Sequence, residues 1–221
     1  MKIKWLGHSS FLITSENGTK IVTDPYTPTD SLTYAPFNQP ADIITISHDH
    51  FDHNNIASVK GGPVIVKETK TVKDIQFQAI PSFHDESSGK ERGKNNIFCF
   101  TVDGVRVCHL GDLGQMPTDS QIAAIGEVDV LLSPVGGNYT IDPEQADKTR
   151  DQIKPRIFIP MHFRNEMCRL PISGVEEFLR GKRNVTRFDG SEIELKPETL
   201  PNPTKIVVLQ PAMKTSTSSR R

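Results

Sequence analysis

The feature that most constrains this chain is the hexapeptide His48-Asp49-His50-Phe51-Asp52-His53, which follows the apolar run of residues 43–46. The run has the composition of a buried strand. Alternate residues of an extended segment point the same way, so His48 and His50 can offer their imidazoles to one metal ion. We expect a helix to begin near Asp52 or His53 and to carry both side chains towards a second ion. A polar loop whose histidines only cap a helix is the alternative, which this density of ligand types disfavours.

Three further metal-ligating side chains stand at the ends of expected strands. His84 ends Pro81-Ser82-Phe83-His84, Asp112 ends His109-Leu110-Gly111-Asp112, and His162 ends Ile159-Pro160-Met161-His162. A zinc-like ion takes about four to six ligands, so residues from outside the hexapeptide must complete the site. These three positions are the predicted complement.

The pattern His-x-His-x-Asp-His after a buried strand resembles the signature of the metallo-β-lactamase superfamily. That resemblance implies an α/β (α+β) fold, a four-layer αββα sandwich, and a dinuclear metal centre. It implies that His48, His50 and His84 hold one metal, that Asp52, His53 and His162 hold the other, and that Asp112 lies between them. Periodicity alone would leave an α/β barrel open.

Local sequence signals predict strands at the start of the chain, and helices interleaved with further strands after them. Residues 2–23 are expected to form an antiparallel meander with a turn at Asn17-Gly18, and Asp103-Gly104 and Asp189-Gly190 are expected to close hairpins. Expected helices span 54–60, 118–125 with Thr118 as N-cap, 142–153 with Asp142 as N-cap, and 173–180. Residues 26–40 are too proline-rich for a helix and are predicted to be a long surface loop. We expect a single domain over residues 1–211 and a flexible tail over 212–221.

Composition narrows the class of protein. The chain has 26 Lys and Arg against 27 Asp and Glu, a formal charge of −1, which favours neither a nucleic acid nor an anionic membrane as partner. No apolar run approaches the ~20 residues that span a bilayer, and the amino end is typical of a strand rather than a signal peptide. The 3 cysteines form no Cys-x-x-Cys pair and are expected in the core. These features favour a cytoplasmic enzyme.

The expected chemistry is hydrolysis. Two divalent ions sharing Asp112 would hold a bridging hydroxide at neutral pH, and the leaving group would take a proton from Asp52, His8 or water. Zinc comes first among the candidate metals, with manganese, iron and nickel open because no cysteine ligand is present. Asp52, Asp112 and His8 are therefore the candidate catalytic residues, since Gly7-His8 also matches an element near the site in one branch of the superfamily.

That branch is the ascorbate-6-phosphate-lactonase-like one, which the stretch Pro134-Val135-Gly136-Gly137-Asn138-Tyr139-Thr140 also resembles. The resemblance implies that Gly137, Asn138 and Tyr139 line the mouth of the site, and that the substrate is a small ester, lactone or phosphodiester. Nearby cations (Lys90, Arg92, Lys94 and Arg164) face either an anionic substrate or solvent. Asp24 is a candidate to orient a ligand imidazole, and His109 to pack behind the site. A homo-oligomer is consistent with the resemblance to this branch.

Three other functions share these residues. A nuclease of the same fold would use the same two metals, but the neutral charge disfavours it. A mononuclear iron dioxygenase keeps the hexapeptide with one metal, and a non-catalytic module would use metal only to fold. The small-molecule hydrolase is the preferred hypothesis.

Overall fold

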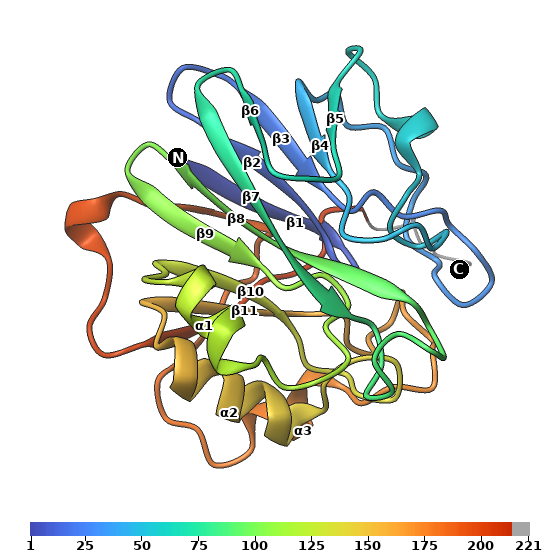
Figure 1. The fold of residues 1–221 in the computed structure, drawn as a ribbon, viewed down its shortest axis with the longest axis vertical. Coiled ribbons are helices and arrows are strands. Elements are labelled where there is room, and N and C mark those ends of the chain that lie inside the picture. The colour runs from blue at the N-terminus through green and yellow to red at the C-terminus, as the bar shows by residue number, and fades with distance from the viewer. Residues whose placement is uncertain (214–221) are drawn as a thin grey trace, which may run out of the picture.

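Two β-sheets pack face to face in the computed structural model, which describes residues 1–213 (Figure 1). One sheet has six strands in the order β13-β1-β2-β3-β4-β5, and the other has eight in the order β12-β14-β11-β10-β9-β8-β7-β6. The strands of the first sheet are β1 (Lys2–Gly7), β2 (Ser10–Thr14), β3 (Lys20–Thr23), β4 (Ile43–Thr45), β5 (Val64–Val66) and β13 (Glu192–Glu194). Those of the second are β6 (Lys70–Val72), β7 (Ile75–Phe83), β8 (Lys94–Val102), β9 (Val105–His109), β10 (Val130–Pro134), β11 (Ile157–Met161), β12 (Val185–Arg187) and β14 (Lys205–Val208).

The main core fills the space between the sheets. Trp5 and Phe11 from the first sheet meet Phe77, Phe98 and Phe100 from the second, and all five side chains are buried. Each such side chain contributes about 1.5–3 kcal/mol of transfer free energy when it leaves water. The two-sheet sandwich predicted from the sequence is therefore confirmed.

The three α-helices lie on the outer face of the eight-stranded sheet (Figure 1). They are α1 (Asp119–Ile125), α2 (Pro143–Ile153) and α3 (Val175–Leu179). Thr118 and Asp142 cap α1 and α2 as predicted, each in a capping box with a glutamine three residues on. The helix expected over 173–180 is shorter than predicted.

The outer face of the six-stranded sheet is covered by a loop rather than by an α-helix. We call residues 24–42 the loop layer. Its prolines exclude a helix, but Tyr26, Leu32, Tyr34 and Phe37 are buried in a second apolar cluster beneath it. The predicted surface loop is thus a packed layer of the structure, because its aromatic side chains point inward. The helix expected over 54–60 is a single 3-10 turn, η1 (Ile56–Ser58).

The antiparallel meander β1-β2-β3 and the β8-β9 hairpin at Asp103-Gly104 are confirmed. The hairpin predicted at Asp189-Gly190 is wrong. Strand β12 pairs in parallel with β14, whereas β13 pairs antiparallel with β1 in the other sheet. The turn residues at Asp189-Gly190 mark a crossing between the two sheets instead. A second 3-10 turn, η2 (Pro197–Thr199), follows β13.

The C-terminal end of the described chain lies beside β1. The backbone N–H of Ala212 donates to the carbonyl of Trp5 (2.9 Å), and that of Met213 donates to Leu6 (3.2 Å). The remainder of the expected tail, residues 214–221, lies outside the described residues. Within residues 1–213, no helix has both the length and the hydropathy needed to cross a membrane.

Candidate metal centre

The candidate ligands lie where strands of both sheets end. His8 follows β1, the hexapeptide follows β4, and His84, Asp112 and His162 follow β7, β9 and β11. Strand ends bring these side chains to one rim of the sandwich although up to 154 positions separate them along the chain, from His8 to His162. All the predicted site residues are brought together.

The hexapeptide reaches this rim by a turn and not by the predicted strand and helix. Strand β4 ends at Thr45, before His48, and the backbone N–H of His53 donates to the carbonyl of His50 (3.0 Å). This turn places Asp52 and His53 beside His8, whereas His50 lies beside His84. The His48 ring contacts both sides, with its centroid 4.6 Å from that of His50 and 4.2 Å from that of His53. The expected helix near Asp52 or His53 is therefore wrong, and the turn separates Asp52 and His53 from His50 but not from His48.

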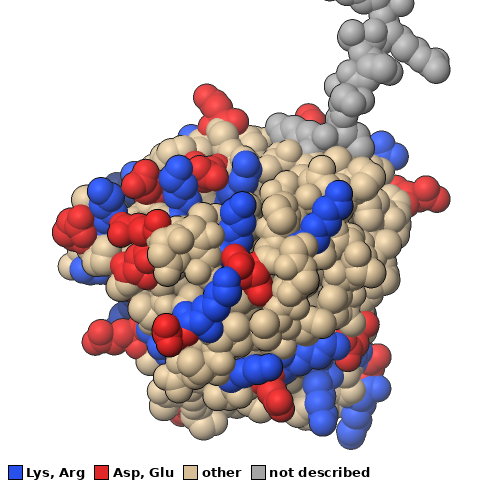
Figure 2. Space-filling model, turned by 90° about the horizontal axis from the view of Figure 1, so that it is seen from above, with Lys and Arg blue, Asp and Glu red and all other residues tan. Residues whose placement is uncertain are grey.

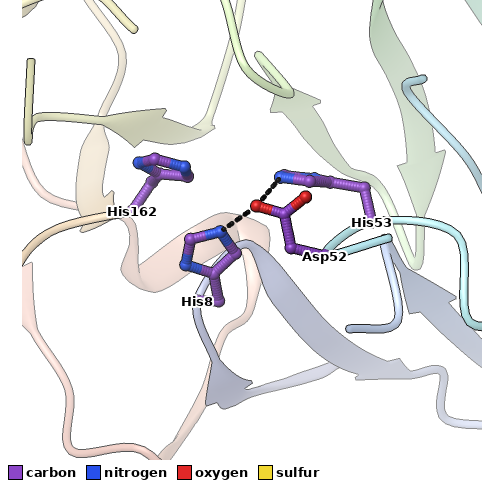
Figure 3. Close-up of side chains that lie close together, drawn as sticks. All are labelled: His8, Asp52, His53 and His162. Atoms are coloured by element: carbon purple, nitrogen blue, oxygen red, sulfur yellow. Dashed lines mark hydrogen bonds and ion pairs between the residues drawn. The ribbon is translucent and has the colours of Figure 1, made fainter. Parts of the chain in front are cut away.

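The ligand atoms form three overlapping groups, in each of which they lie within 4.8 Å of one another. His48, His50 and His84 make the first group, and His8, Asp52, His53 and His162 make the second, which Figure 3 shows. The third, Asp24, His48 and His53, joins them, and the first two are the ones considered below. Asp112 faces both groups through Oδ2. That atom lies 3.3 Å from Nε2 of His84, 3.9 Å from His48, 3.1 Å from His53 and 3.3 Å from His162. A single carboxylate oxygen thus sits between the two sets of imidazoles.

His8 lies inside the cluster. Its Nε2 is 3.3 Å from Oδ2 of Asp52, and its ring centroid is 4.2 Å from that of His162 (Figure 3). Its carbonyl accepts from the Trp5 indole (2.9 Å) and from the backbone N–H of His162 (3.3 Å). His8, Asp24 and His162 all have a positive φ, of 52°, 37° and 49°. Such backbone strain persists only where the surroundings enforce it, and it is concentrated at functional sites.

Asp24 and Ser47 orient two of the imidazoles. The Nδ1–H of His53 donates to Oδ2 of Asp24 (2.9 Å), and the backbone N–H of Ser47 donates to Oδ1 (2.8 Å). The hydroxyl of Ser47 lies 2.9 Å from Nδ1 of His48. Both rings therefore turn Nε2 towards the cluster. Hydrogen bonds of this kind are the usual way in which a protein fixes a metal-binding histidine.

Asn95 positions Asp112. Its side chain donates to the carbonyl of Leu110 (2.9 Å) and accepts from the backbone N–H of Asp112 (3.0 Å). Gly111, with φ of 58°, has no room for a side chain, because a Cβ there would lie 2.3 Å from Oδ1 of Asn95. The sequence reasoning missed Asn95 and Ser47. A polar residue within an apolar run was the only available signal, and it does not distinguish a role at the site from an ordinary core hydrogen bond.

His109 packs behind the site, as expected. Its Nδ1 accepts from the backbone N–H of Gly111 (3.1 Å), so its Nε2–H donates to the carbonyl of Ser9 (2.8 Å). Both ring nitrogens are used, and the imidazole is buried. His109 therefore supports the turn before Asp112.

The cluster concentrates negative charge in a buried place. Burial opposes ionisation of Asp112, yet His162 and His53 outweigh it and hold the pKa of that carboxyl well below its ordinary value. The pKa of Asp52 and of Asp24 is lowered as well, because burial is outweighed by His53 in both cases. Burial, assisted by His53, lowers the pKa of His48 to about 3, and burial with His162 lowers that of His8 to about 4. Burial disfavours a proton on His53, but Asp112 and Asp52 raise its pKa well above the ordinary value.

These residues fit bound cations. Three carboxylates with lowered pKa values lie beside imidazoles of which His8 and His48 also have lowered pKa values, and buried charge of one sign is costly without a partner. Nε2 of His48, Nε2 of His53 and Oδ1 of Asp112 are buried and have no hydrogen-bond partner. Imidazole nitrogens and carboxylate oxygens in this mixture suit zinc, manganese, iron or nickel.

Comparison with known proteins agrees with this fold. Residues 2–162 match the beta-lactamase superfamily domain. A UPF0173 metal-dependent hydrolase from Methanoculleus marisnigri is 30% identical over 229 residues, covering 90% of this chain and 98% of the relative. One from Carboxydothermus hydrogenoformans is 31% identical over 192 residues, covering 74% and 84%.

A solved structure extends the match to three dimensions. It is a protein from Thermotoga maritima assigned to the Zn-dependent hydrolases of the metallo-beta-lactamase superfamily, with a TM-score of 0.77, 37% identity, and coverage of 94% of this chain and 97% of that one. The sandwich, the rim of ligands and these matches lead to one conclusion. The chain belongs to the UPF0173 family of the metallo-beta-lactamase superfamily.

Proposed function

We propose that the protein is a metal-dependent hydrolase that holds two divalent cations and acts on a small ester, lactone or phosphodiester. The observation that carries this proposal is Oδ2 of Asp112, which faces both groups of imidazoles at 3.1–3.9 Å. The similarity to relatives described as metal-dependent hydrolases supports it. Bound cations would supply Lewis acidity and a nucleophile derived from water at neutral pH.

Each residue then has a defined task. His48, His50 and His84 would hold one cation, and Asp52, His53 and His162 the other. Asp112, whose Oδ2 faces imidazoles of both sets, would hold both. Asp24 and Ser47 keep the rings of His53 and His48 in place. Oδ2 of Asp52 and Nε2 of His8 are 3.3 Å apart, so a proton can pass between them towards a leaving group.

The proposal extends to the metal, the branch of the superfamily, the domain organisation, the location and the oligomeric state. Zinc is the first candidate metal, with manganese, iron or nickel as alternatives. The lactonase-like branch is favoured by the loop after β10, where Gly136 packs so closely that a Cβ would lie 2.3 Å from the carbonyl of His162. We further propose a single domain over residues 1–211, a cytoplasmic location, and a homo-oligomer acting on a small molecule.

Two observations weigh on the alternatives. On the face shown in Figure 2, Lys and Arg side chains alternate with Asp and Glu, so that face carries no continuous basic track of the kind a nuclease uses. His50 with His84, and Asp52 with His162, fall in different groups of ligand atoms, which favours two metals over the single iron of a dioxygenase.

The test pairs metal content with turnover. Protein purified without added metal is analysed for metals per chain and assayed on bis-p-nitrophenyl phosphate and on a panel of small lactones. We expect two metals per chain, and hydrolysis that is lost in Asp112→Ala but kept in the control Asp30→Ala, whose side chain is exposed. A single iron, or no turnover with both metals bound, would contradict the proposal.

A further inference from the structure

A cavity of about 480 Å³ is lined by His48 and His50, and no other candidate metal ligand of the described residues lines it. Three cationic side chains line it, and each comes from a different segment. Lys67 follows β5, Arg92 belongs to the β7–β8 loop (residues 84–93), and Lys94 begins β8. The fold thus brings three positive charges to the edge of the candidate metal centre.

The charge of this cavity is only partly balanced. Among the described residues, Asp49 is the one acidic side chain that lines it. Asp49 accepts hydrogen bonds from Lys67 and from the amide of Asn54 (2.7 Å), so it is already occupied. The nearest carboxylate to Arg92 is that of Glu91, at 3.7 Å, a loose ion pair on an exposed side chain. The cavity therefore keeps an excess of positive charge.

Hydrogen bonds within the β7–β8 loop hold Arg92 in place. The buried carboxylate of Asp85 accepts the backbone N–H groups of Ser87 and Gly89 at 2.8 Å each, and those of Glu91 and Arg92 at 3.1 and 2.7 Å. The guanidinium of Arg92 lies over the ring of Tyr139, 5.3 Å from its centroid. Because Asp85 directly follows His84, one turn fixes a candidate metal ligand and this cation together.

We propose that the cavity is an anion subsite that binds a carboxylate or phosphate group of the substrate while the neighbouring ester or lactone bond lies at the metal centre. The inference rests on the proposed function and narrows the substrate to anionic molecules. Arg92 supplies a planar fork that matches either oxyanion, and Lys94 supplies a point charge, whereas Lys67 is paired with Asp49. The bound group does not react. It holds the substrate, so its contribution falls mainly on KM.

The first arm of the test measures binding without turnover. Inorganic phosphate and succinate are titrated into the metal-loaded protein by calorimetry, with Lys94→Gln and Arg92→Gln as test variants and Lys70→Gln as control. Lys70 lies on β6, is exposed, and does not line the cavity. Loss of one charged contact is expected to weaken binding by about tenfold in each test variant. The stronger of the two probes identifies phosphate or carboxylate as the preferred group.

The second arm measures hydrolysis of two matched esters, p-nitrophenyl hemisuccinate, which is anionic, and p-nitrophenyl butyrate, which is neutral. Lys94→Gln and Arg92→Gln are expected to raise KM for the anionic ester about tenfold more than for the neutral one. Equal effects on both esters, or equal weakening of anion binding in Lys70→Gln, would overturn the subsite. If no ester is hydrolysed but anion binding still depends on Lys94 and Arg92, the proposed function fails and the subsite stands.

Discussion

The carboxylate of Asp24 fixes the ring of His53 from behind, through a hydrogen bond of 2.9 Å in a fully buried setting. Replacing Asp24 by Asn keeps the size of the side chain but removes the negative charge that favours the Nδ1–H form of the ring. We expect Asp24→Asn to weaken metal binding by about 10–100-fold, the usual effect of losing such a partner. Competition with a chromophoric chelator measures the change.

Asp30→Asn is the matched control, because Asp30 is exposed in the loop layer. Unchanged metal affinity in Asp24→Asn, at equal folded fraction, would mean that the hydrogen bond to His53 is only structural.

At this scale the sequence predicted the residues whose pattern is local. The hexapeptide carries four of the candidate ligands within six positions, and His84, Asp112 and His162 each follow an apolar run. Asn95 and Ser47 were not predictable, because their roles depend on hydrogen bonds across strands that the chain order does not reveal. His8 is a candidate from resemblance and not from a local pattern, since its contact with Asp52 spans 44 positions.

The β7–β8 loop is an element held by one side chain. Burial opposes ionisation of Asp85, but hydrogen bonds from the backbone N–H groups of Arg92, Gly89, Glu91 and Ser87 outweigh it and lower its pKa to about 2. In Asp85→Asn the amide presents N–H groups to two of those donors. We expect the loop to open and trypsin to cleave after Lys90 and Arg92 at least about tenfold faster. Mass spectrometry of the fragments measures the rate.

Glu86→Gln is the control for this prediction. It removes a negative charge from the same loop, while the side chain of Glu86 is exposed and contacts only Gln145, at 2.9 Å, among the hydrogen bonds of the described residues. Equal rates of cleavage in both variants would show that the loss of a negative charge alone, and not the loss of the hydrogen bonds to Asp85, makes the loop open.

The apolar cluster beneath the loop layer, which holds Tyr26, Tyr34 and Cys168, is expected to make the protein sensitive to alkaline pH. Burial raises the pKa of Tyr26 and of Tyr34 above the ordinary value of 10.0, and that of Cys168 to about 11 from 9.0. The folded state therefore holds these protons more tightly than the unfolded state. The contribution of these protonated groups to the free energy of unfolding is fully present below pH 9. It is expected to fall as the pH rises through 10 and 11. Urea unfolding at pH 8, 10 and 11 measures the free energy.

Tyr34→Phe removes one of the titrating groups and the hydrogen bond that its hydroxyl accepts from Asn165 (2.8 Å). We expect this variant to be less stable at pH 8 by about 1 kcal/mol and to lose less stability than the wild type by pH 11. Phe37→Leu, in the same layer, should keep the wild-type pH dependence. Parallel profiles for all three proteins would contradict the explanation.

Elements were predictable where their signals are local. The caps Thr118 and Asp142 and the turn Asp103-Gly104 form within a few residues, and the structure has all three. Asp189-Gly190 carries the same turn chemistry, but Ile193 is buried in the main core beside β1, so tertiary packing overrides the local preference for a hairpin. The packing of the loop layer is not predictable from its sequence, because the prolines that exclude a helix say nothing about the burial of Tyr26 and Tyr34.

For the whole molecule, the candidate ligands connect the two sheets. His48, His50 and His53 follow the six-stranded sheet, whereas His84, Asp112 and His162 follow the eight-stranded one. Bound cations would therefore tie the sheets together and stabilise the folded state by about 4 kcal/mol when the free metal is 1,000 times its Kd. We expect a chelator to lower the Tm and added zinc to restore it, as calorimetry would measure.

Asp112→Ala should respond to zinc much less than the wild type in the same experiment. A Tm that does not change on metal removal, with loss of metal verified by analysis, would mean that the sheets hold together without cations at this rim.

The crossing between β12 and β13 has a consequence for synthesis of the protein. Strand β13 pairs with β1, and the N-terminal ammonium of Met1 donates to the carbonyl of Leu195, 194 positions away. A ribosome that adds ~5–20 residues per second needs roughly 10–40 s to make the partner after making β1. During that interval one edge of β1 has unpaired backbone N–H and C=O groups. The nascent chain is therefore most exposed to edge-to-edge association at its own first strand.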